Sequence, residues 1–399
     1  MGGRKQELTM REKPGHYLLM SPNDTPKMQE PHTTVELRLF NLQHVYSYIY
    51  QAQEASRLEV SHETKLSIPT VTTNISELER LGLVVKVGEQ KSTGGRRAQI
   101  FKCNNLARVA IGVEILKGGI QLVAIDLYGA ILKECHDETP FENTDSYYQH
   151  LGGFINTFAK SLEIERDHIL GVGIALQGLI SPDGSIVTYS EILRCTGTER
   201  KRFQEYIDYP CTLVHDTDAA ALAEIWHVAD INSAVYLALN RNFGGTLIIN
   251  GQVGKNLELS NSVIEHMCLD PSGPLCYCGR HGCVETFCSA NHLSEMAGMD
   301  IPQFFISLHQ GDSHCKQVWS TYTSYLARAM ENVRMTLNCD FILGGYLMQF
   351  TQESDFDGLA EAIDAQCSLL HSSCTIRFSR FAEKSPKLGA AISFVDAFL

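Results

Sequence analysis

The stretch from His266 to Glu285, HMCLDPSGPLCYCGRHGCVE, constrains the fold of this chain more than any other stretch. One histidine is followed, ten positions on, by three cysteines in the pattern Cys-x-Cys-x4-Cys. An imidazole and three thiolates make the Cys₃His donor set of closed, tetrahedral zinc sites. Gly279 and Gly282 permit the tight turns that bring three sulfurs to one ion. The spacing predicts one structural zinc ion per chain, held by His266, Cys276, Cys278 and Cys283, with a loop of buried, inert thiols as the alternative.

The composition is that of a globular protein without a membrane segment. The chain has 399 residues, of which 44% are hydrophobic and 20% are charged, enough for two or three domains with sizeable cores. No apolar run reaches the roughly 18 residues of a membrane span, and no charged-then-apolar leader opens the chain, so neither membrane insertion nor secretion is expected. In such a chain, 13 cysteines indicate metal ligands and reduced core thiols rather than disulfides. We therefore expect a cytoplasmic location.

The charge is unevenly distributed along the chain. A formal net charge of −13, taken whole, argues against a nucleic-acid partner. Residues 1–104, however, contain 14 Lys and Arg against 11 Asp and Glu, whereas the other residues contain 19 against 35. A slightly basic head on an acidic body is the distribution expected of a DNA-reading module fused to a regulatory domain.

The first hundred residues read as an arm followed by a winged helix-turn-helix. Residues 1–34 are polar and aperiodic, which predicts a flexible arm. Residues 35–104 show the helical periodicity, turn residues and strand-forming runs of three helices and a hairpin. The expected helices span 35–55, 60–66 and 70–81, and the expected strands span 83–87 and 98–101. A helical hairpin with a solvated polar face is the alternative.

The third of these helices carries short polar side chains suited to base edges and phosphates in a major groove. Two arginines in the loop between the strands are suited to phosphates or to a minor groove. The predicted DNA-contacting residues are Thr70, Thr72, Thr73, Asn74, Ser76, Arg96 and Arg97.

The rest of the chain, residues 105–399, alternates strands with helices. Three successive strands, a helix and a buried strand open it, at 109–115, 120–127, 130–135, 146–164 and 169–176. Further strands are expected at 234–239, 246–249 and 340–343, and further helices at 317–337 and 388–398. This order predicts an α/β domain of the actin-like, ribonuclease-H-like type, with lobes at about 105–226 and 227–399.

The zinc stretch also resembles the signature of the ROK family, which contains sugar kinases and sugar-responsive repressors. Cys276, Cys278, Gly279, Gly282, Cys283 and Glu285 stand in the family's Cys-x-Cys-Gly-x-x-Gly-Cys-x-Glu pattern, and His266 matches its metal histidine. The wing Gly94-Gly95-Arg96-Arg97 is similar to the Gly-Gly-Arg-Pro wing of the family's repressors. The resemblance runs from about residue 38 to the end, and it leaves kinase and repressor to be separated by other residues.

The phosphate-binding turns that the family's kinases need are altered. Where kinases resemble Gly-Ile-Asp-Ile-Gly-Gly-Thr-Lys, this chain has Leu116 and Lys117 in place of glycines, and the shifted pair Gly118-Gly119 is expected to join two strands. In the second turn, Asn240 and Asn242 replace two glycines. Because backbone amides must approach the phosphates closely, these side chains argue against ATP binding. The chain is therefore predicted not to be an enzyme.

The resemblance implies an effector site made of Gly178, His215, Asp216 and Glu285. Asp216 stands where the family has a general base, which without a phosphoryl donor can still accept a hydrogen bond from a sugar hydroxyl. The family's Glu-Ile-Gly-His segment, however, reads Val263-Ile264-Glu265-His266 here, so its sugar-contacting glutamate is lost. Glu265, one residue from the histidine, would point elsewhere on a strand.

These features predict a transcriptional repressor of sugar uptake or catabolism genes, similar to the amino-sugar- and glucose-responsive members of the family. A homodimer or homotetramer would bind a palindromic double-stranded DNA operator, and a sugar or sugar-phosphate effector would shift the population away from DNA. Two alternatives stay open at this point: a ROK sugar kinase with an accessory DNA-binding domain, and a repressor released by a sugar-transport protein rather than by a small molecule.

Overall fold

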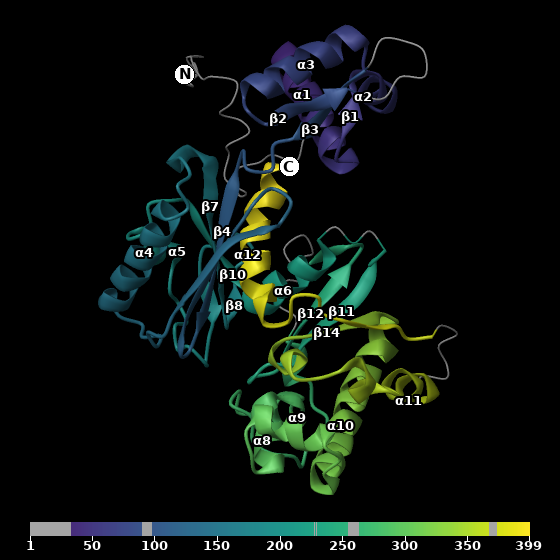
Figure 1. Ribbon diagram of the computed structural model, residues 1–399. Helices are drawn as coiled ribbons and strands as arrows, with labels where there is room; N and C mark the ends of the chain where they lie inside the picture. The colour runs from purple at the N-terminus through teal and green to yellow at the C-terminus, as the bar shows by residue number, and fades with distance from the viewer. Residues whose placement is uncertain (1–32, 90–97, 227, 229, 254–262, 367–372) are drawn as a thin grey trace, which may run out of the picture.

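The computed structural model describes residues 33–89, 98–226, 228, 230–253, 263–366 and 373–399 (Figure 1). Most of the predicted arm, and both Arg96 and Arg97, lie outside these ranges. Within them, no helix combines the length and the apolar character that crossing a membrane requires.

The N-terminal head has three helices, each started by a hydroxyl side chain. They are α1 (Thr34–Ala52), α2 (Arg57–Thr64) and α3 (Ile68–Arg80). Thr33 and Ser56 form capping boxes with the glutamates three residues on, and Ser67 accepts from the Thr70 amide. The second helix thus begins three residues before the expected position, because Ser56 caps it.

A three-stranded sheet completes the head. Its strands are β1 (Ala55–Ser56), β2 (Val84–Glu89) and β3 (Gln99–Cys103), in the order β1-β3-β2. Val45, Ile49, Val71 and Ile75 of the helices are buried together with Phe101 of β3. The predicted order of helices and hairpin is therefore confirmed, and a short strand between α1 and α2 is added to it.

The first lobe of the body is built on a five-stranded sheet of order β10-β7-β4-β5-β6. The strands are β4 (Val109–Leu116), β5 (Gly119–Ile125), β6 (Ile131–Asp137), β7 (Ile169–Leu176) and β10 (Cys211–His215). The first three form an antiparallel meander, and β4, β7 and β10 run parallel. Helices α4 (Asp145–Lys160) and α5 (Arg200–Gln204) lie over one face of this sheet (Figure 1).

The second lobe has its own five-stranded sheet, of order β13-β12-β11-β14-β15. The strands are β11 (Ser233–Ala238), β12 (Gly244–Ile249), β13 (Gln252–Val253), β14 (Asp340–Gly344) and β15 (Ile376–Phe378). A helical layer covers it, formed by α7 (Glu285–Cys288), α8 (Ala290–Ala297), α9 (Ile301–His309), α10 (Ser313–Leu337) and α11 (Leu359–Gln366). Two five-stranded sheets with helices confirm the predicted α/β class.

The last helix, α12 (Ser385–Phe398), belongs to the first lobe, and its expected place at the end of the second lobe is wrong. It lies along β4, β7 and α6 (Asp216–Ile225), on the sheet face opposite α4 (Figure 1). Glycines on both sides let the backbones touch: a Cβ on Gly112 of β4 would lie 1.8 Å from the Lys387 carbonyl oxygen, and one on Gly389 of α12 would lie 1.6 Å from the Ala219 carbonyl oxygen. Side chains would hold these elements apart, so small residues determine where this helix can dock.

The far end of α12 reaches the head. Phe398 packs edge-on against Tyr46 of α1, with ring centroids 6.1 Å apart. The Ser47 hydroxyl donates to the Leu399 carbonyl at 3.3 Å. Residues of α1, β3, β4, β5 and α12 form one continuous hydrophobic core. The head and the first lobe are therefore packed together and do not meet through a linker alone.

Candidate metal centre and effector cavity

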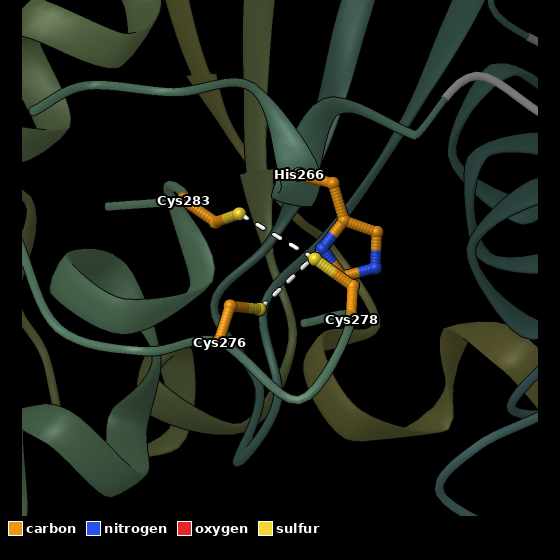
Figure 2. A group of neighbouring side chains, drawn as sticks. All are labelled: His266, Cys276, Cys278 and Cys283. Carbon is orange, nitrogen blue, oxygen red and sulfur yellow. Dashed lines mark hydrogen bonds between the residues drawn. The ribbon is translucent and has the colours of Figure 1, made fainter. Parts of the chain in front are cut away.

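His266, Cys276, Cys278 and Cys283 converge in the second lobe (Figure 2). Their ligand atoms all lie within 4.8 Å of one another. Cys278 Sγ lies 3.7 Å from Cys283 Sγ, and Cys276 Sγ lies 3.6 Å from His266 Nδ1. A tetrahedral zinc ion about 2.3 Å from each sulfur would separate the sulfurs by about 3.8 Å. The distances fit a metal ion, as the sequence pattern predicted.

The loop holds this shape because two glycines occupy conformations that other residues avoid. Gly279 and Gly282 have φ values of +83° and +68°, and a Cβ on Gly282 would lie 1.6 Å from the Asp270 carbonyl oxygen. His266 comes from a 3₁₀ turn, Ile264–His266, rather than from a strand. Burial lowers the pKa of His266, which favours the neutral imidazole that binds metals.

A cavity of about 210 Å³ lies beside this loop, between the two lobes. The first lobe contributes Gln177–Leu179, Tyr189–Ile192 and His215–Thr217. The second contributes Asn240, Asn242–Gly244, Val263, Glu265, His266, Tyr277, Cys278 and Arg280. It is smaller than the roughly 300–1,000 Å³ typical of drug-sized ligands, and polar groups face it from both sides. The cavity thus has room for a small polar ligand, and the loop with the four candidate metal ligands forms one of its walls.

Three of the four predicted effector residues line this cavity together: Gly178, His215 and Asp216. Glu285 does not belong to the lining, so its predicted ligand contact is not supported. The Glu285 carboxylate is buried behind the lining, where it accepts from Asn242 Nδ2 at 2.9 Å and from the Phe243 amide at 2.5 Å. Because both carboxylate oxygens have protein donors, Glu285 positions the turn beside the cavity.

Glu265 lines the cavity, contrary to the expectation that it would point elsewhere. That expectation assumed a strand, in which neighbouring side chains face opposite sides. In the observed 3₁₀ turn, the adjacent residues Glu265 and His266 both line the cavity. The sequence signal for this position was a glutamate directly before the candidate metal histidine. The backbone conformation decided the direction in which that glutamate points.

Acidic side chains surround His215. Its Nε2 lies 3.3 Å from Asp216 Oδ1, and its Nδ1 lies 3.7 Å from Asp218 Oδ1. Burial opposes a charge on this imidazole, but the carboxylates of Asp218, Asp216 and Glu265 outweigh burial and raise the pKa of His215 to about 9. His215 is therefore protonated at neutral pH, and it partly balances the carboxylates that face the cavity.

The turns that match the kinase phosphate loops are occupied by the protein's own contacts. Leu116 pairs with Gly119, so Lys117 and Gly118 form a two-residue hairpin turn between β4 and β5, as expected. Asn240 Oδ1 accepts from the Tyr346 amide at 2.7 Å. The Arg241 guanidinium lies over the Tyr346 ring, 5.1 Å from its centroid. These turns line a cleft of about 990 Å³ that adjoins the smaller cavity.

The predicted DNA-contacting residues on α3 do not share one face. Thr73 and Ser76 are exposed, and Thr70 and Thr72 are half-buried. Asn74 is only 6% exposed, and its Nδ2 donates to the Thr70 carbonyl at 3.0 Å. Its prediction as a base-reading residue is therefore wrong, because the helical period turns it toward the head's core. Arg80 lies on the exposed side of α3, where its guanidinium donates to the Glu77 carboxylate at 2.7 Å.

The fold and the site define a two-lobed α/β protein with a small-ligand cavity between its lobes. The model of the ROK family matches residues 110–396, and the chain belongs to that family. The resemblance found in the sequence is thereby confirmed.

Individual relatives include regulators and kinases. The DNA-binding transcriptional dual regulator NagC of Escherichia coli is 29% identical over 269 residues, which is 66% of this chain and 66% of NagC. The match thus spans just under two thirds of that relative's length. A ROK family transcriptional regulator described as a homologue of E. coli Mlc shares the fold, with TM-score 0.75 and 21% identity over 91% of this chain and 96% of its own.

A kinase shares the fold of the body. The ROK glucokinase of Streptomyces griseus, solved with glucose and AMPPNP, has TM-score 0.61 and 18% identity, covering 71% of this chain and 98% of its own. Nearly all of that kinase is thus matched by part of this chain. The body is kinase-like in fold, and the chain contains more than the kinase does.

Proposed function

We propose that this protein is a DNA-binding transcriptional regulator, a repressor of sugar uptake or catabolism genes, rather than an enzyme. The observation that supports this proposal most is the presence of an N-terminal head joined to the ROK body. Its three capped helices and small sheet support a winged helix-turn-helix, whose third helix enters a major groove. The exposed Thr73 and Ser76 of α3 are suited to that groove, and Arg96 and Arg97 are proposed as phosphate contacts.

The body is proposed to be the regulatory part, of the actin-like type and holding one structural zinc ion. A sugar or sugar phosphate would bind between the lobes, beside the zinc loop. Because α6 begins at Asp216 in the cavity wall and packs on α12, and α12 ends on α1 of the head, a change in lobe closure can alter the position of the head. An effector shifts DNA affinity only if it prefers one lobe arrangement.

Selection of duplex DNA tests the proposal directly. The full-length protein should enrich a palindromic sequence from a random duplex library, with half-sites about one helical turn apart as expected for two heads of a homo-oligomer. No enrichment with folded, zinc-containing protein would contradict the DNA-binding role.

Two neighbouring substitutions on α3 should separate base contact from folding. Thr73→Ala should lower affinity for the selected site, by about 1–3 kcal/mol if the side chain reads a base, at an unchanged melting temperature. Asn74→Ala should instead lower the melting temperature, because Asn74 is buried and bonded to its own helix. Fluorescence anisotropy on selected and scrambled duplexes, with thermal unfolding of each variant, measures both. Equal binding losses with no change in melting for Asn74→Ala would reverse this assignment.

The protein is expected not to phosphorylate sugars. The contact between Asn240 and Tyr346 and the side chain of Lys117 occupy turns that would have to cradle ATP phosphates. A coupled kinase assay with glucose, N-acetylglucosamine, N-acetylmannosamine, fructose and allose should stay at background, with a ROK glucokinase as the positive control. Turnover at an ordinary kcat/KM of about 10⁴ M⁻¹s⁻¹ or more would refute the non-enzymatic body while leaving the head untouched.

A further inference from the structure

Glu265 is an unusual group in the wall of the cavity. Its side chain is only 8% exposed, and it lines the same cavity as His215 and Asp216. Among the residues that the structure describes, its Oε2 atom has no hydrogen-bond partner. Buried polar atoms nearly always have a partner, because leaving one unsatisfied destabilises the fold, and more so when the atom is charged. An unsatisfied carboxylate oxygen in the wall of a cavity is positioned to accept a hydrogen bond from a ligand.

The surroundings of Glu265 indicate what kind of donor fits. Asp216, Asp218 and Glu285 are the other carboxylates near it, His215 is a nearby cation, and Arg280 also lines the cavity. Carboxylates concentrated at this end of the cavity repel an anionic group such as a phosphate. They accept hydrogen bonds from hydroxyl groups, which a sugar presents in number.

Val263 does not compete for such a hydroxyl. It lines the cavity with methyl groups only and is 41% exposed. The carboxylate that the family motif would supply at position 263 is thus replaced, two positions along the same turn, by that of Glu265.

We propose that Glu265 binds the effector directly, by accepting hydroxyl hydrogen bonds from a monosaccharide, and that it determines which monosaccharide the protein recognises. The inference rests on the proposed regulatory function of the cavity and adds to it the residue that selects the sugar. A phosphate on the same sugar would have to lie away from Glu265, toward the adjoining cleft, where Lys117, Arg194 and Arg241 are in the lining. The hydroxyl contact is common to the free and the phosphorylated sugar.

Calorimetry on the full-length, zinc-containing protein tests the proposal. The probes are glucose, N-acetylglucosamine, glucosamine, xylose and fructose, with the 6-phosphates of the first two to separate free from phosphorylated sugars. At least one probe should bind the wild type, and Glu265→Gln should weaken it tenfold or more, because the amide keeps the size but loses the charged acceptor. Glu295→Gln, at an exposed carboxylate on α8, should bind as the wild type does.

The exchange variant Val263→Glu/Glu265→Gly moves the carboxylate to the position of the family motif. It should change the order of preference among the probes rather than abolish all binding. Zinc content and melting temperature are measured for every variant, because Glu265 precedes His266 in sequence. A Glu265→Ala variant serves in place of Glu265→Gln if the latter loses zinc.

The proposal is overturned if no probe binds the wild type, or if the Glu265 variants bind within twofold of it while retaining zinc. Neither result would contradict the proposed DNA-binding function, because selection of duplex DNA by the head is measured without any sugar. Conversely, loss of the DNA result alongside sugar binding that depends on Glu265 would leave the inference about the cavity standing.

Discussion

Cys278→Ser is expected to lose the bound metal and to unfold at a clearly lower temperature than the wild type. A structural zinc site contributes its binding energy to folding, about 10–16 kcal/mol in small zinc-finger peptides. Losing one of four ligands should cost this protein at least about 3 kcal/mol. For a folding unit of 150–250 residues, that corresponds to a fall in melting temperature of roughly 6 °C or more. Elemental analysis and thermal unfolding provide the measurements.

The neighbouring Cys268 provides the matched control. It lies in the same loop and is exposed, and it is not one of the four converging ligands. Cys268→Ser should therefore keep one equivalent of zinc and the wild-type melting temperature. If Cys278→Ser retained full metal and full stability, or if the two variants behaved alike, the assignment of the ligand set would be wrong.

Gly389→Ala is the second substitution expected to have a large effect. A Cβ at this position would lie 1.6 Å from the Ala219 carbonyl oxygen of α6, a backbone atom that cannot rotate away. Overpacking of a core usually costs about 1–3 kcal/mol, and a clash between two helix backbones should reach at least the upper end. Because α6 carries Asp216 and α12 ends on the head, displacing α12 should also weaken DNA binding.

Gly153→Ala is the control for the intrinsic preference of helices for alanine. Gly153 lies in the exposed part of α4, and a Cβ there would meet no atom within 4 Å. Alanine at this site should be neutral or should stabilise the protein by up to about 1 kcal/mol. Denaturant unfolding of both variants, with anisotropy on the selected operator, gives the comparison. A Gly389→Ala protein as stable as wild type would show that α6 and α12 are not in the close contact described.

Cys278→Ser and Gly389→Ala test different parts of one proposed path from ligand to DNA. The loop with the candidate metal ligands forms one wall of the cavity, and α6 starts in the opposite wall. From there, α12 runs to α1, where Tyr46 and Phe398 meet. A variant that keeps both zinc and sugar binding but loses the response of DNA affinity to sugar would place the defect in the helices rather than in the cavity.

Local sequence signals were enough to predict many of the strands and the candidate metal ligands of this protein. The four candidate metal ligands were identifiable because their donor set and their glycines are both contained in twenty consecutive residues. Most strands were found to within about two residues, because their apolar runs are buried in the sheets. β7 spans Ile169–Leu176, the range expected from its sequence. The altered phosphate turns were also visible, since a side chain in place of glycine is a property of the sequence itself.

Only the tertiary structure decided where side chains with two plausible directions point. Asn74 faces the core because it lies on the same helical face as Val71 and Leu78, which are buried in the head. Glu285 has its donors, Asn242 and Phe243, from a segment about forty residues away. Glu265 faces the cavity because its segment is a 3₁₀ turn.

The position of α12 belongs with these features. Its sequence determines that it is an apolar helix rich in small residues. Which sheet it covers was decided by Gly112 and Gly173, more than two hundred residues earlier, where the absence of side chains leaves room for its backbone. Periodicity and spacing report what a segment is, because they depend on near neighbours. Docking depends on shape complementarity between distant segments, which no local pattern contains.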